Sequence, residues 1–161
     1  MRDRDTAGRA RNARPRDAAG RPLPHGATGV ERVPDDLVLS ADATITEAQR
    51  LLDAGLPFPA HDVLEAAWKA APELERPVWR ALAQLAVGLT HVQRGNARGA
   101  AALLERSGDA LARWIGPPVA DVDTAGLASW ACALAGRIGQ DGLDGLDGMT
   151  VAGLTPRLRS R

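Results

Sequence analysis

The chain has 161 residues, the size of one ordinary domain, and its 20 basic and 20 acidic side chains leave no net charge. This balance excludes a global positive field that would draw the whole protein to nucleic acid or to a membrane surface. Apolar residues make up 45% of the chain and aromatic residues only 3%, and such an alanine-rich composition favours helices over strands. No apolar run approaches the roughly 18 residues of a membrane-spanning helix, and no apolar core of a signal peptide follows the arginine-rich start. We therefore expect a cytoplasmic protein with no membrane partner.

Residues 1–36 differ in composition from everything that follows. They contain many Gly, Pro and Arg residues and almost no large apolar side chains. Such a segment cannot bury enough surface to offset the entropy lost on ordering, so we predict a disordered, arginine-rich N-terminal extension. Arginine clusters can dock on phosphates, but no aromatic side chain is interleaved here to stack on bases, and we do not expect a nucleic-acid partner.

The first predicted helix runs from about residue 44 to residue 54. Thr44 and Glu47 have the spacing of a capping box, in which a hydroxyl and a carboxylate satisfy each other's backbone N–H groups. Gly55 and Pro57 then end the helical pattern. The folded part of the chain is therefore expected to begin near residue 40.

Prolines and a glycine mark the starts and ends of the next two predicted helices. Pro59 fits the first turn of a second helix, which Pro72 ends, and Pro77 opens a third. Gly95 fits the left-handed stop after that third helix, and Asn96 fits the N-cap of a fourth. The pair predicts a tight helix–turn–helix.

The remaining chain predicts two more helices and a tail. The fourth helix runs through Trp114 and stops before Gly116, and Asp123 or Thr124 caps a fifth that extends through Ile138. Three aspartates then recur at three-residue spacing, which favours a turn-rich linker over a calcium loop because the usual bidentate glutamate is missing. The prediction is an all-α, up-and-down bundle of about five helices over residues 40–138, with a flexible C-terminal tail over residues 139–161.

The single cysteine, Cys132, can form neither an internal disulfide nor a multi-cysteine metal site. It stands in an apolar stretch of the predicted fifth helix. We therefore predict a buried, inert thiol.

Polar side chains that could carry chemistry gather on the second and third predicted helices. A helical residue turns by about 100° from its neighbour, which places three of them within about 60° on the second helix. Two others are seven residues apart on the third helix, with Gly88 between them at nearly the same angle. If the two faces oppose each other, the side chains converge. The candidate binding residues are His61, Glu65, Trp68, Gln84 and His91.

The same region resembles a known family. The resemblance covers about residues 50–115 and is carried by Phe58, Ala60, His61, Leu64, Glu65 and Trp68, followed by Leu85, Ala86, His91, Gly95, Asn96, Gly99 and Ala100. In these residues the chain resembles the domain of unknown function 309 family. The resemblance implies a small all-α, cytoplasmic, bacterial or archaeal domain with no established activity. Pro59 and Asp62 stand where the family pattern usually has glutamates, which weakens a mechanism that needs a large acidic cluster.

Three interpretations of the candidate residues stay open. They can satisfy one another and fix the helix register, or line a groove for a peptide or small molecule, with Trp68 as an apolar anchor and Arg94 or Arg98 near the rim. Alternatively, Glu65 and the histidines hold a divalent metal or form a general base.

The sequence favours a binding or scaffolding module for an unknown protein or small molecule. We expect it to need no cofactor and no metal, and we leave homo-oligomerisation open. The alternative is a metal-dependent enzyme that uses His61, Glu65 and His91.

Overall fold

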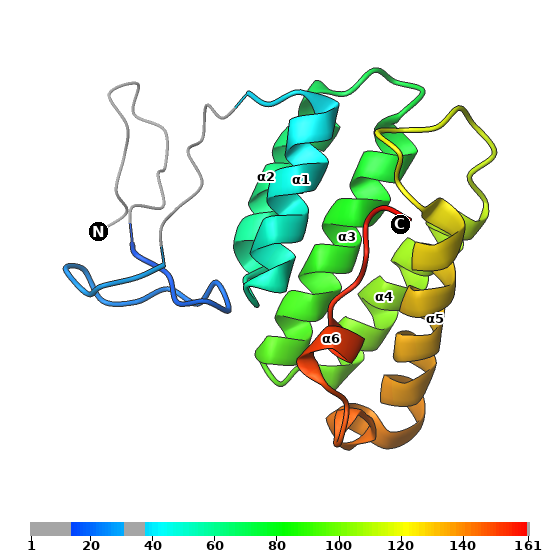
Figure 1. Cartoon of the computed structure of the whole chain (residues 1–161). Coiled ribbons are helices and arrows are strands. Elements are labelled where there is room, and N and C mark those ends of the chain that lie inside the picture. Colours follow the sequence, from blue (N-terminus) through cyan, green and yellow to red (C-terminus); the bar gives the residue numbers. More distant parts are fainter. Residues whose placement is uncertain (1–13, 31–37, 161) are drawn as a thin grey trace.

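Five long helices form an up-and-down bundle (Figure 1). The computed structural model describes residues 14–30 and 38–160, and within these ranges the chain forms helices and two isolated β-bridges but no strand. The helices are α1 (Ala41–Asp53), α2 (Pro57–Ala70), α3 (Arg76–Gln93), α4 (Ala97–Ala112) and α5 (Thr124–Asp141), followed by the 3-10 helix η1 (Gly142–Leu146) and the short α6 (Val151–Leu154). The predicted all-α bundle is confirmed.

Side-chain caps fix the starts of three of the five long helices. Asn96 and Asp123 accept hydrogen bonds from backbone N–H groups in the first turns of α4 and α5, at 3.0 and 2.9 Å, as predicted. The capping box predicted at Thr44 is wrong, because α1 begins earlier with Ser40 as its N-cap. The Thr44 hydroxyl instead donates to the Ser40 carbonyl oxygen at 2.8 Å inside the first turn.

The core lies where each helix packs against the next one in the chain. It is built from small and aliphatic side chains, with Leu64, Leu82, Leu85, Leu104 and Leu111 among the largest that are fully buried. Gly88 permits close approach of α3 and α4, since a Cβ there would lie 2.9 Å from Leu104 Cγ. The face of α3 at Gly88 therefore packs against Leu104 of α4. No helix in the described part of the chain combines the length and apolarity needed to cross a membrane.

The C-terminal segment that follows α5 packs on the bundle, although its composition predicts a flexible tail. It runs back along the bundle (Figure 1), and Leu158 is only 1% exposed. The Gln49 side chain on α1 donates to the Pro156 carbonyl oxygen at 3.0 Å and accepts from the Leu158 N–H at 2.8 Å. The buried side chains of Leu146, Pro156 and Leu158, together with the two hydrogen bonds of the Gln49 amide, therefore hold this segment against the bundle.

Residues 14–30 also contact the folded part, whereas the rest of the predicted extension, residues 1–13 and 31–36, lies outside the described residues. The contact centres on Phe58 at the start of α2. The guanidinium carbons of Arg16 and Arg94 lie 5.4 and 5.7 Å from the centre of its ring. Arg94 Nε also donates to the Ala19 carbonyl oxygen at 2.7 Å. One aromatic ring between two cations thus provides an attachment that counting aliphatic residues overlooks.

The prediction of a buried Cys132 is wrong, because the residue is exposed. It lies at the edge of α5 beside α4, where only the missing side chain of Gly108 leaves room for its sulfur. Partial burial raises the pKa of the Cys132 thiol above its ordinary value, and the nearby carboxylates of Asp109 and Glu105 raise it further.

Candidate functional site

The structure distributes the five candidate residues among three places instead of one. His61 and Glu65 lie together on α2, where Asp62 joins them. Trp68 and Gln84 line a groove formed by α2, α3 and α4. His91, near the end of α3, contacts the turn that leads into α4. The expected single convergence therefore separates into an acidic cluster, an open groove and a turn contact.

His91 supports the turn between α3 and α4. Its Nδ1 lies 3.1 Å from the Asn96 side-chain nitrogen, and a Cβ on Gly99 would come within 3.2 Å of the imidazole ring. The partly buried ring thus packs against the residues that begin α4. It is not a member of the cluster around His61.

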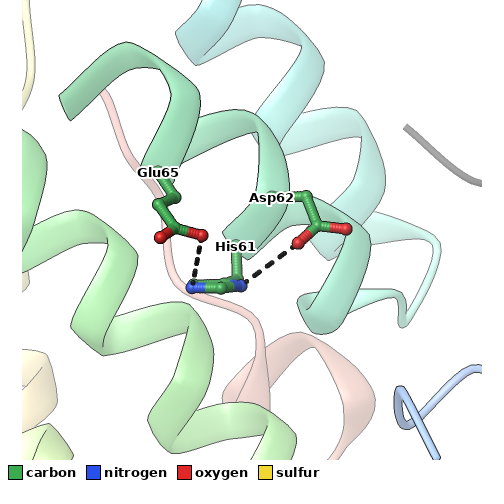
Figure 2. Close-up of side chains that lie close together, drawn as sticks. All are labelled: His61, Asp62 and Glu65. Carbon is green, nitrogen blue, oxygen red and sulfur yellow. Dashed lines mark ion pairs between the residues drawn. The ribbon is translucent and has the colours of Figure 1, made fainter. Parts of the chain in front are cut away.

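The His61 cluster consists of His61, Asp62 and Glu65, and Lys69 is its counter-charge. Asp62 Oδ1 lies 3.4 Å from His61 Nδ1, and Glu65 Oε2 lies 3.6 Å from His61 Nε2 (Figure 2). Lys69 Nζ lies 3.0 Å from the other oxygen of Glu65. The imidazole is thus bracketed by two carboxylates, and one of these already has a cation.

The chemistry of a metal ion does not fit this arrangement well. The ligand atoms of His61, Asp62 and Glu65 lie within 4.8 Å of one another. However, the two carboxylates face opposite nitrogens of the same ring, as Figure 2 shows. A metal bound about 2.1 Å from one imidazole nitrogen would have one carboxylate beside it and the other across the ring. Lys69 already pairs with one oxygen of Glu65, and the buried His61 Nδ1 has no hydrogen-bond partner within the described residues.

A groove of about 520 Å³ opens near the C-terminal end of α2. We call it the Trp68 groove. Side chains from α2, α3, α4 and the loop between α2 and α3 line it. The lining residues are Trp68, Glu73, Arg76, Pro77, Arg80, Ala81, Gln84, Arg106, Ala110 and Arg113. Four guanidinium groups therefore share one concave surface with a single carboxylate.

The spacing of these arginines along their helices explains why they meet. Arg76 and Arg80 are four residues apart on α3, and Gln84 lies a further four residues along the same face. Arg106 lies on α4, and Arg113 is that helix's C-cap residue, seven residues on. Since α3 and α4 pack against each other, both pairs border the same groove.

The groove arginines lack the counter-charges that the His61 cluster has. Within residues 14–30 and 38–160, none of the four forms an ion pair, and the Glu73 carboxylate forms none either. Arg76 Nε donates to the Ala71 carbonyl oxygen at 3.2 Å, and Arg80 lies over the Trp68 ring at 5.8 Å. Four cations held close together without carboxylate partners make a local positive field that an anion would relieve.

Trp68 differs from the other three tryptophans in its indole N–H. The indoles of Trp79, Trp114 and Trp130 each donate to a carboxylate or carbonyl oxygen at 3.3 Å. Trp79 is only 2% exposed, so its indole N–H is a buried donor that has an acceptor. The Trp68 indole N–H has no hydrogen-bond partner among the residues that the structure describes, and it lies at the groove.

Sequence reasoning found Trp68 and Gln84 but missed the charges that accompany them. It placed Arg94 or Arg98 at the rim, and neither lines the groove. Arg94 contacts Phe58 and the N-terminal segment instead. The four-residue spacing from Arg76 through Gln84 was a signal that could have identified the basic face.

Comparison with known proteins identifies the middle of the chain. Residues 45–103 match the family model described as Domain of unknown function (DUF309), which confirms the resemblance seen in the sequence. The matched segment includes α2 and α3, hence the His61 cluster and the α2 and α3 sides of the Trp68 groove. No curated protein and no solved structure matches the chain.

Proposed function

Starting from a chain whose residues 45–103 match this family, we propose that the protein is a binding module that takes up an anionic ligand in the Trp68 groove. The observation that carries the proposal is the set of four guanidinium groups, free of carboxylate partners within the described residues, around one concave surface. Guanidinium groups bind carboxylates and phosphates through paired N–H donors, which makes them suited to anions.

Trp68 and Gln84 complete the binding surface. The indole offers an apolar ring and an N–H donor that has no partner within the described residues, and the Gln84 amide offers a donor and an acceptor. Sites with a few convergent polar groups around an aromatic surface are typical of ligand binding. A cytoplasmic location and a bacterial source, expected from the sequence, fit this proposal and are predictions.

The experiment follows the Trp68 indole signal by nuclear magnetic resonance. The protein with ¹⁵N-labelled tryptophan is titrated with pyrophosphate and, separately, with citrate, and Trp68→Phe assigns the signal. We expect the Trp68 indole resonance to shift in a saturable way while those of Trp79, Trp114 and Trp130 stay in place. Absence of a shift with both anions at low salt would overturn the proposal.

A matched pair of arginine variants tests where the anion binds. Arg106→Ala removes a groove arginine, whereas Arg98→Ala removes another exposed arginine of α4 that does not line the groove. Loss of one solvent-exposed contact of about 0.7 to 1.4 kcal/mol corresponds to about a 3- to 10-fold weaker affinity. We expect this loss for Arg106→Ala and less than a 2-fold change for Arg98→Ala. Equal effects would show that only general charge is sensed.

A further inference from the structure

Two large aliphatic side chains stand almost fully in solvent at the end of the bundle where the Trp68 groove opens. Leu74 is 77% exposed and Ile115 is 99% exposed. Leu74 directly follows Glu73, which lines the groove, and Ile115 is two residues beyond Arg113, which also lines it. The loop from α2 to α3 and the loop from α4 to α5 lie at the same end of the bundle (Figure 1). Two exposed aliphatic residues thus stand next or close in sequence to residues that line the basic groove, at the same end of the bundle.

We infer that the occupant of the Trp68 groove is an acidic segment of a partner protein that also carries branched aliphatic side chains. This inference rests on the proposed anion binding and names the class of ligand. Exposed aliphatic side chains near a charged groove contribute nothing to binding of a free phosphate, because they can gain energy only by burial against other apolar groups.

The distance over which the groove arginines are spread also favours an extended peptide over a small anion as the ligand. Arg76 and Arg80 are separated by about 6 Å along α3, and Arg106 and Arg113 by about 10 Å along α4, at about 1.5 Å per residue. A single carboxylate or phosphate cannot contact charges over that length. An extended peptide advances about 3.3 Å per residue, so three or four residues span the groove.

The mixture of residue types resembles that of peptide-binding surfaces in general. Tryptophan and arginine are enriched among the residues that contribute most to protein interfaces. Here Arg80 lies over one side of the Trp68 ring at 5.8 Å, which hinders the stacking of a nucleic-acid base on that side. The surface therefore combines guanidinium groups for carboxylates, an aromatic ring, and Leu74 and Ile115 for aliphatic side chains.

The test compares two labelled 12-residue peptides by fluorescence anisotropy. One alternates Asp or Glu with Leu or Ile, and the other has Ser in place of every Leu and Ile. We expect the first to bind the full-length chain at least 10-fold more tightly. Because Leu74 and Ile115 are exposed, the double variant Leu74→Ser/Ile115→Ser should fold normally, which thermal unfolding checks. It should remove the 10-fold preference without weakening the serine peptide.

Other outcomes separate this inference from the proposed function. Binding of pyrophosphate and of both peptides with equal affinity leaves anion binding in place and overturns the aliphatic requirement. Tighter binding to oligo-deoxythymidine, or to vesicles of phosphatidylcholine with phosphatidylglycerol, overturns the protein-segment assignment. If neither peptide binds and pyrophosphate leaves the Trp68 signal unchanged, both the inference and the proposed function fail.

Discussion

The His61 cluster and the Trp68 groove both include residues of α2, but they differ in whether their charged side chains have partners of opposite charge. In the cluster, an imidazole lies between two carboxylates, and Lys69 neutralises one of them at 3.0 Å. In the groove, four guanidinium groups share one surface, and none has a carboxylate partner within the described residues. The comparison teaches that the residues most suggestive of catalysis already have charged neighbours, whereas the four groove arginines, which sequence reasoning did not single out, have no carboxylate partner within the described residues.

The largest expected effect is on anion binding by the groove. Arg76→Glu combined with Arg80→Glu replaces two attractive charges with repulsive ones. We expect about a 100-fold loss of affinity for pyrophosphate, or about 2.7 kcal/mol. Isothermal titration calorimetry at low and high salt measures it. Glu65→Gln, in the His61 cluster, is the control and should change the affinity by less than 2-fold.

If Glu65→Gln weakened pyrophosphate binding as strongly as the arginine reversals, the two regions would be one site. The contrast between them would then be lost.

The next largest effect is a loss of thermal stability when the N-terminal segment that contacts Phe58, beside the His61 cluster, is removed. Phe58 lies 5.8 Å from the His61 ring and is held by Arg16 and Arg94. Deleting residues 1–30 removes part of that cover, and we expect a loss of about 1 kcal/mol, or about 4 °C in Tm. Differential scanning calorimetry of the full and shortened chains measures it. An unchanged Tm would support the disordered N-terminal extension predicted from composition. It would show that residues 14–30 do not pack on the bundle in solution.

A smaller stability effect should distinguish satisfied from unsatisfied charges. Glu65 is 33% exposed, so its pairs with His61 and Lys69 are partly screened. Glu65→Ala should lower the free energy of unfolding by about 0.5 kcal/mol. Arg106→Ala should leave it level or raise it slightly at low salt, because a like-charged neighbour is removed. Urea unfolding measures both, and a stabilising Glu65→Ala would reverse the comparison.

Cys132 reports on two acidic residues of α4. Burial and the carboxylates of Asp109 and Glu105 raise its pKa, so less thiolate is present at neutral pH than for a free thiol. We expect its reaction with a disulfide reagent to be slower than that of N-acetylcysteine at pH 7.5, with a midpoint at higher pH. Asp109→Asn with Glu105→Gln should move the midpoint down. A midpoint at or below that of the model thiol contradicts the assignment.

The smallest expected effect is that of metal ions on the His61 cluster. Its carboxylates face different nitrogens of one ring, so zinc, manganese and nickel should give no saturable heat with untagged protein. His61→Ala is the matched control. A stoichiometric heat that disappears in this variant would revive the metal-site interpretation.

The sequence by itself determined the order of the helices and most of their ends. Asn96 and Asp123 cap α4 and α5 as expected, because a capping side chain acts on backbone groups only three residues away. Local rules suffice for such features. They also placed His61 and Glu65 together, since residues four apart on a helix are neighbours whatever the fold.

Only the tertiary structure decided what each helix face meets. The separation of His91 from His61, and the joining of Trp68 with arginines of α3 and α4, depend on how the helices are rotated against one another. Gly88 and Leu104 fix part of that rotation through a contact that no periodicity specifies. Gln49 likewise anchors a C-terminal segment more than 100 residues away. Long-range packing selects these partners, and a single sequence does not record them because side chains of the same type would fit several rotations equally well.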